Sequence, residues 1–204
     1  MRVYFVRHGE SEANVRRVFS SRDPESHPLT PRGREQAQKR AKDLKRVHLD
    51  RAFSSDLLRA VQTMEVLLDG RPIPRATTTL LREHDPGDWE GHSDEETWDK
   101  LEEIFAAWLS GDIDARPNGG ESLVDLQSRF FDFISMLTER YAEQAESILV
   151  VGHAGIFAVS LPLLFVNVDH EFAREQGLDN ADLIVGEYDA GRWRCLEWAG
   201  ARLE

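Results

Sequence analysis

The chain has 204 residues, of which 41% are hydrophobic and 30% charged, a balance that provides the core of one domain and excludes a disordered chain. The 37 acidic and 25 basic residues give a net charge of -12, which repels nucleic acid and anionic membrane surfaces, so we expect neither as a partner. The single cysteine, Cys195, excludes a disulfide framework and indicates a reducing, cytoplasmic location, and no apolar run approaches the ~20 residues of a membrane span.

Predicted strands and helices alternate along the chain. In chain order, periodicity, caps and turn residues predict a buried strand at 3–6, a helix from Thr30 to about Val47, a strand at 51–54, and helices at 57–68, from a Ser93/Glu96 capping box to Trp108, and from Ser122 to Tyr141. A buried strand at 148–151, a helix after His153 up to Pro162 and a hairpin of 183–188 with 193–198 follow.

This alternation predicts an α/β fold, a three-layer sandwich with a mostly parallel central sheet flanked by helices. We see no linker, so residues 1–204 are expected to form a single domain. The segment at about 92–120 interrupts the alternation with extra helical sequence. We expect that segment to form a lid over a site.

Chemically versatile side chains follow the predicted strands. The first buried strand runs into Arg7 and His8 and the second into His153, and α/β sheets bind ligands beyond the carboxyl ends of their strands. Arg59 falls in the first turn of a helix, where free N–H groups favour an anion, and its planar fork suits phosphate. With the carboxyl group of Glu83, these residues provide a nucleophile, cationic donors and an acid for phosphoryl transfer. Each residue taken singly also suits a structural or surface role, so the prediction depends on their convergence.

Six blocks of sequence occur in a fixed order. They are Val6-Arg7-His8-Gly9-Glu10-Ser11 with Asn14; Pro28-Leu29-Thr30 with Gly33; Phe53-Ser54-Ser55-Asp56-Leu57 with Arg59; Leu81-Arg82-Glu83 with Trp89-Glu90-Gly91; Gly119-Gly120-Glu121-Ser122; and Val150-Val151-Gly152-His153. In this order they resemble the histidine phosphatase superfamily, also called the phosphoglycerate mutase-like family, over nearly the whole chain.

The resemblance implies a phosphoglycerate mutase-like fold and phosphoryl transfer through a phosphohistidine, without metal or cofactor. It makes His8 the nucleophile, Glu83 the proton donor, and Arg7, Arg59 and His153 the phosphate pocket. Asn14 matches a position that often adds a phosphate contact. Ser20 and Ser21 replace a common Gln-Gly, and Gly152 and Ala154 replace a common hydroxyl residue and glycine. We expect Ser20 and Ser21 to contact the substrate.

The resemblance favours the hydrolytic branch of the family. Pro86 stands where many phosphatases have an aromatic residue, and 84–91 lacks the tyrosine-containing pattern of the mutases. We therefore expect a phosphomonoesterase for a small phosphorylated metabolite. A phosphoglycerate mutase-type phosphotransferase, a phosphoprotein phosphatase and a catalytically silent phosphate-binding protein remain alternatives.

Several features stay open at this point. The leaving group ranges over sugar or glycerate phosphates, ribazole-like nucleoside phosphates and phosphoproteins, and a homodimer is compatible with the sequence. Arginines after the nucleophile could bind a second anionic group or be solvated: Arg16, Arg17 and Arg22. A crowded set of imidazole and carboxylate groups could hold a metal, although a solvated acidic loop explains them more simply: His84, Asp85, Asp88 and His92.

Overall fold

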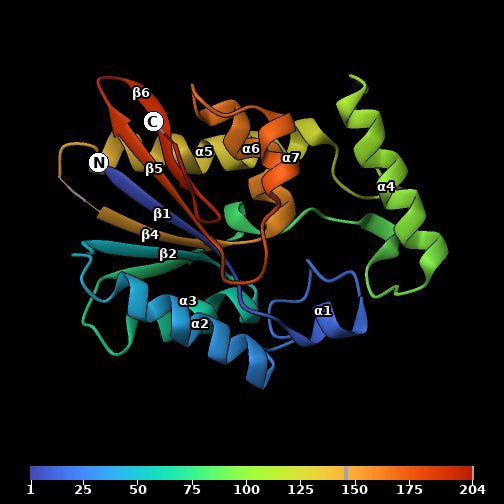
Figure 1. Cartoon of the computed structure of the whole chain (residues 1–204). Coiled ribbons are helices and arrows are strands. Elements are labelled where there is room, and N and C mark those ends of the chain that lie inside the picture. Colours follow the sequence, from blue (N-terminus) through green and yellow to red (C-terminus); the bar gives the residue numbers. More distant parts are fainter. Residues whose placement is uncertain (145–146, 204) are drawn as a thin grey trace.

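A computed structural model describes residues 1–144 and 147–203, so positions 145, 146 and 204 of the predicted domain lie outside the described residues. A central sheet crosses the molecule with helices on both faces (Figure 1). Its strands are β1 (Arg2–Arg7), β2 (Arg51–Ser55), β3 (Arg75–Thr78), β4 (Ser147–Gly152), β5 (Leu183–Asp189), β6 (Arg192–Trp198) and β7 (Ala201–Arg202). The helices are α1 (Glu12–Arg16), α2 (Pro31–Leu44), α3 (Leu58–Leu68), α4 (Glu95–Leu109), α5 (Leu123–Tyr141), α6 (Ala154–Leu164) and α7 (His170–Gln176), with short 3-10 turns η1 (Thr79–Leu81) and η2 (Gly87–Trp89).

The seven-stranded sheet has the order β3-β2-β4-β1-β5-β6-β7. The pairs among β1, β2, β3 and β4 are parallel, whereas β5 pairs antiparallel with β1 and β6, and β7 antiparallel with β6. The strands β1 to β4 and β6 therefore point one way and β5 and β7 the other. The sheet is mixed, and the predicted three-layer α/β sandwich and its β5–β6 hairpin are confirmed.

Side chains of the central strands enter two separate cores because successive residues point to opposite faces of a sheet. In β1, Val3 and Phe5 pack into a core with residues of α5 and α6, whereas Val6 packs into a core with residues of α2 and α3. In β4, Val150 and Val151 divide in the same way. Burial on both faces explains why these strands are uninterrupted apolar runs in the sequence.

Strand register brings the two predicted histidines together. Arg7, the last residue of β1, pairs with Gly152, the last residue of β4. His8 and His153 therefore leave adjacent parallel strands at the same level of the sheet. On the other side of β4, Ser54 of β2 pairs with Val151, so the start of α3 lies at the same edge.

Helix boundaries differ from the sequence prediction at three places, and one is the end of α2, which stops at Leu44 and not near Val47. The N-cap of α4 is Asp94, whose carboxylate accepts from the Thr97 N–H at 3.0 Å, so the Ser93/Glu96 capping box was wrong. A carboxylate is a strong acceptor that also suits the positive end of the helix dipole. The helix after His153 continues through Pro162 to Leu164. Ser122 is the N-cap of α5 as expected, and the structure adds a capping box with Asp125.

Candidate active site

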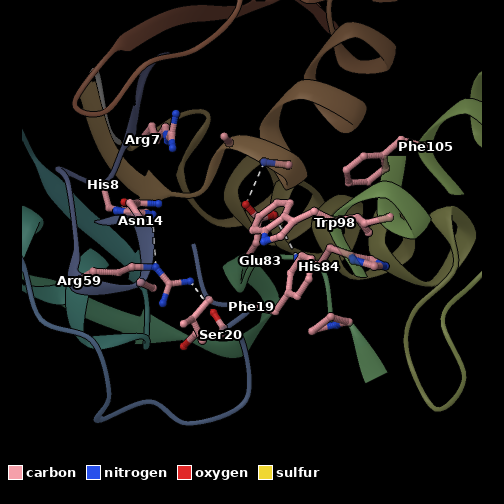
Figure 2. A pocket seen from close by; sticks show the side chains of 16 residues that line it. Arg7, His8, Asn14, Phe19, Ser20, Arg59, Glu83, His84, Trp98 and Phe105 are labelled. Carbon is pink, nitrogen blue, oxygen red and sulfur yellow. Dashed lines mark hydrogen bonds between the residues drawn. The ribbon is translucent and has the colours of Figure 1, made fainter. Parts of the chain in front are cut away.

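A cavity of about 270 Å³ opens at the edge of the sheet where β1 and β4 end. Figure 2 shows the side chains around it, which come from β1, α1, the loop after α1, α3, the segment around η2, α4 and α6. Six of the predicted site residues lie in its polar wall: Arg7, His8, Asn14, Ser20, Arg59 and Glu83. The sheet geometry therefore gathers side chains that are far apart in sequence.

The His8 imidazole is buried, and its two nitrogens have different roles. Nδ1 lies 2.7 Å from the Gly9 carbonyl oxygen, and because a carbonyl only accepts, Nδ1 carries the proton. Nε2 then has the lone pair, and it accepts a hydrogen bond from Arg59 Nε at 3.2 Å. Burial, followed by the charges of Arg59 and Arg7, lowers the pKa of His8 well below its ordinary value. His8 is therefore neutral, and in this structure its Nε2 lone pair accepts from Arg59.

Arg59 is the second residue of α3 and is only 4% exposed. Its Nη2 donates to the Ser20 carbonyl at 2.7 Å, and burial lowers the pKa of the guanidinium to about 10, so the side chain stays charged at neutral pH. Thr63, one turn further along α3, donates to the Arg59 carbonyl at 2.7 Å and accepts from the Gly9 N–H at 3.1 Å. Thr63 thus links α3, which carries Arg59, to the loop that carries His8.

Four side-chain nitrogens around His8 are buried without a hydrogen-bond partner. They are Arg7 Nε, Arg59 Nη1 and both ring nitrogens of His153, and within the described part of the chain they are the only such nitrogens. The rings of His153 and His8 lie 5.0 Å apart between centroids. Burial, together with Arg59 and His8, lowers the pKa of His153 well below its ordinary value. Unpaired buried polar atoms are costly, and a group rich in acceptor oxygens would satisfy the three that can donate, because a neutral His153 has one N–H.

Glu83 reaches the cavity from the loop after η1 and lies at the N-terminus of α6. Its Oε1 accepts from the N–H groups of Ile156 at 2.9 Å and His84 at 3.0 Å, and Oε2 accepts from the Gly155 N–H at 2.9 Å. A carboxyl group has about four acceptor positions. Oε2, with one amide bond, therefore keeps a position for a proton or a substrate oxygen.

Residues that sequence reasoning missed hold the Glu83 segment in place. Arg129 of α5 donates to the carbonyl groups of Leu80, Arg82 and Glu83 at 3.0, 2.6 and 3.0 Å. It also forms a two-pronged ion pair with Glu121, at 2.7 and 2.9 Å. Glu121 and Arg129 are eight residues apart, outside the three- or four-residue spacing of helical side-chain pairs, so no local pattern in the sequence indicated this pair or its link to the loop 80–83.

The remaining predicted contacts divide. Asn14 lines the cavity and lies beside His8 (Figure 2). Its Oδ1 accepts from the Ser11 N–H at 3.0 Å, so this oxygen takes part in the capping box of α1. Ser20 lines the cavity. Ser21 is not among the residues that line the cavity. It lines a neighbouring depression, and its N–H donates to Glu90 at 3.1 Å. The expectation that Ser21 contacts the substrate is therefore not supported by its position.

The residues of the alternative metal site have separate partners. His84 Nε2 lies 2.9 Å from the Glu121 carbonyl, Asp85 pairs with Arg22 at 2.8 Å, Asp88 accepts from Asn118, and His92 pairs with Asp94. Over residues 1–144 and 147–203, no group of three or more His, Cys, Asp or Glu side chains is placed to hold a metal ion. The same described residues contain no helix that is both long and apolar enough to cross a membrane.

A buried nucleophilic imidazole surrounded by cationic donors, at the carboxyl edge of an α/β sheet, defines an enzyme of phosphoryl transfer. The family model of the histidine phosphatase superfamily (branch 1) matches residues 3–200, and the chain belongs to this superfamily. It is 34% identical over 164 residues to the adenosylcobalamin/alpha-ribazole phosphatase of Salmonella typhimurium, covering 80% of this chain and 79% of that protein.

Two further similarities bear on the reaction. The 2,3-bisphosphoglycerate-dependent phosphoglycerate mutase of Cytophaga hutchinsonii is 32% identical over 185 residues, with 89% of this chain and 82% of that protein covered. The crystal structure of the alpha-ribazole phosphatase from Shigella flexneri superposes with a TM-score of 0.82 at 28% identity, over 100% of both chains. Similarity extends to hydrolases and mutases alike.

Proposed function

We propose that the protein is a metal-independent phosphomonoesterase for a small phosphorylated metabolite and that it works through a phosphohistidine at His8. The observation that carries this proposal is the neutral Nε2 of His8 among buried, unpaired nitrogens of Arg7, Arg59 and His153. Three equatorial oxygens of a transferring phosphoryl group would accept from Arg7, Arg59 and the one N–H of a neutral His153. The similarity to phosphatases of small metabolites supports the same reaction.

The reaction proceeds in two displacements. His8 Nε2 attacks phosphorus, the bond from phosphorus to the ester oxygen breaks, and Glu83 Oε2 gives its proton to that leaving oxygen. Water then attacks phospho-His8, Glu83 takes up a proton from this water, and the phosphorus–nitrogen bond breaks. Arg7, Arg59 and His153 hold the phosphoryl oxygens in both steps.

The surroundings of the site complete the proposal. The α4 helix serves as the lid of a single domain, because Trp98, Leu101 and Phe105 of this helix line the cavity. The net charge of -12 opposes nucleic acid as a partner, and one buried free cysteine, Cys195, suits a reducing cytoplasmic location. A homodimer remains compatible with the proposal.

Phosphate release from benzyl phosphate in the presence of EDTA tests the function. The wild-type protein should keep its activity under these conditions, whereas His8→Asn should lose it while keeping its circular dichroism spectrum. Loss of activity with EDTA and its return with a divalent ion would contradict the metal-free mechanism.

The mutase alternative has its own assay. Phosphorus NMR of 3-phosphoglycerate with a bisphosphorylated primer should show phosphate release without faster exchange between phosphoglycerate isomers. Exchange that outpaces release would replace the hydrolase by a mutase. If the protein catalyses neither reaction on any phosphomonoester, the alternative of a phosphate-binding protein is left.

A further inference from the structure

The cavity has a second end, away from the phosphate-binding nitrogens, whose wall is apolar. Described residues of this wall are Val18, Phe19, Pro86, Trp98, Leu101 and Phe105. Trp98, Leu101 and Phe105 recur at helical spacing, so they share one face of α4. Leu101 is 7% exposed, and Trp98, which also lines the cavity, lies beside Phe19 (Figure 2).

The aromatic part of this wall is already ordered. Trp98 Nε1 donates to the Arg17 carbonyl at 2.8 Å, and its indole stacks on Phe19 with 4.1 Å between centroids and 29° between planes. Phe19 is fixed in turn, because its N–H donates to the His92 carbonyl at 3.0 Å and its carbonyl accepts from Gly91. A preformed wall binds a planar group with little loss of side-chain freedom.

Charge at this end of the cavity is unfavourable to a second anion. Among the described lining residues the lysines and arginines are Arg7 and Arg59 alone, and both lie at the phosphate end. Glu83, which also lines the cavity, adds no positive charge. An anionic leaving group would therefore be desolvated beside an aromatic wall without an arginine or lysine to compensate it.

The arginines after the nucleophile do not supply that cation. Arg22 donates to Asp85 at 2.8 Å and to the Gly119 carbonyl at 2.7 Å. The guanidinium of Arg17 is engaged with the Trp98 ring, 5.5 Å from its centroid, and is not among the residues that line the cavity. Arg16 is exposed at the end of α1 and does not line the cavity. The acidic residues of the α4 surface include Glu102 and Glu103, which are exposed and add to the repulsion.

We infer that the substrate is a phosphomonoester whose leaving group is uncharged and carries an aromatic ring that lies against Trp98 and Phe105; this inference rests on the proposed function. The cavity volume of about 270 Å³ lies just below the range of ligand pockets, roughly 300–1,000 Å³. It suits a phosphoryl group and one ring-sized group. Glycerate phosphates, which carry a carboxylate near the ester, fit this site poorly.

A set of three substrates tests the inference: benzyl phosphate, methyl phosphate and 3-phosphoglycerate. We expect kcat/KM for benzyl phosphate to exceed that for 3-phosphoglycerate by about 100-fold. Trp98→Ala should lower the ratio of benzyl to methyl phosphate kcat/KM by about tenfold, because stacking and apolar contact with the ring are lost. Trp98→Leu keeps an apolar side chain and should lower the ratio as well, by less. Glu103→Ala, an exposed change on the same helix, should leave it unchanged.

The possible failures of the two proposals differ. Turnover of 3-phosphoglycerate that equals that of benzyl phosphate overturns the inference and leaves the phosphatase intact. An unchanged benzyl to methyl ratio in both Trp98 variants does the same. Absence of hydrolysis with all three substrates, in a folded wild-type protein, overturns the proposed function and the inference with it.

Discussion

Replacing Gly155 with alanine tests how Glu83 is held without changing the carboxyl group itself. A Cβ atom at position 155 would lie 2.5 Å from Glu83 Oε1, 3.0 Å from Cδ and 3.2 Å from Oε2. An ordinary contact is about 3.4 Å or longer, so the carboxyl group must move by about 1 Å. A displacement of that size at a reacting group costs about 100-fold in rate, within the range of ~100- to 10,000-fold that general acid catalysis contributes.

The choice of leaving group isolates the proton-donor role of Glu83. Benzyl alcohol leaves only with a proton, whereas p-nitrophenolate leaves without one. We expect Gly155→Ala to lower kcat for benzyl phosphate by about 100-fold and kcat for p-nitrophenyl phosphate by far less. Glu83→Gln, which keeps the size of the side chain, should show the same contrast. Equal losses on both substrates, or none on either, would refute the assignment of Glu83 as the acid.

Three further predictions concern the phosphate grip and the core. Arg59→Lys should lower kcat/KM by about 100-fold because the planar fork is lost. Arg59→Met removes the positive charge that lowers the pKa of His8, so this pKa should rise and the acid limb of the pH–rate profile should move to higher pH. An acid limb that stays in place would contradict the role of the Arg59 charge. Gly152→Ser should destabilise the fold by about 1–3 kcal/mol in urea unfolding, because a Cβ there would lie 2.6 Å from the Phe157 ring; unchanged stability would show that the ring moves freely. Burial lowers the pKa of His8 and His153 in the folded protein, so below about pH 6.5 their imidazoles bind protons in the unfolded chain and not in the folded one. As the pH falls, the free energy of unfolding should therefore decrease by about 1.4 kcal/mol per pH unit for each of the two histidines; a His153→Asn variant with the wild-type slope would contradict this.

Elements with strong local signals were predicted from the sequence. The runs that became β1 and β4 are apolar because both of their faces are covered, and α5 has a capping box and a long apolar face. By contrast, β3 has the sequence RATT and is mostly exposed at the edge of the sheet. The helix α1 has five residues and is too short to show a helical periodicity in the sequence.

The same distinction applies to the site. His8 and His153 directly follow strands, so sheet geometry alone predicted that they would meet. The place of Glu83 depends on amides of α6 and on Arg129, contacts distant in sequence that no local pattern encodes. Ser21 was expected in the site because Ser20 and Ser21 stand where the family commonly has Gln-Gly, but its N–H donates to Glu90.

The aromatic residues of the lid also needed the structure. In the sequence, Trp98, Phe105 and Trp108 recur at helical spacing, a pattern that suits a core helix and a lid equally. In the structure Trp98 and Phe105 line the cavity, whereas Trp108 is 5% exposed and donates to the Ala115 carbonyl at 2.8 Å. One stripe thus serves both purposes.

Direct detection of the covalent intermediate tests the central claim. The protein would be mixed with benzyl phosphate, quenched within milliseconds in alkaline denaturant that preserves phosphohistidine, and digested for mass spectrometry. We predict a phosphoryl group on the peptide containing His8, on the histidine itself, and none in His8→Asn. Hydrolysis that continues in a folded His8→Asn variant, or a phosphoryl group carried by another residue, would contradict the assignment of His8 as the nucleophile.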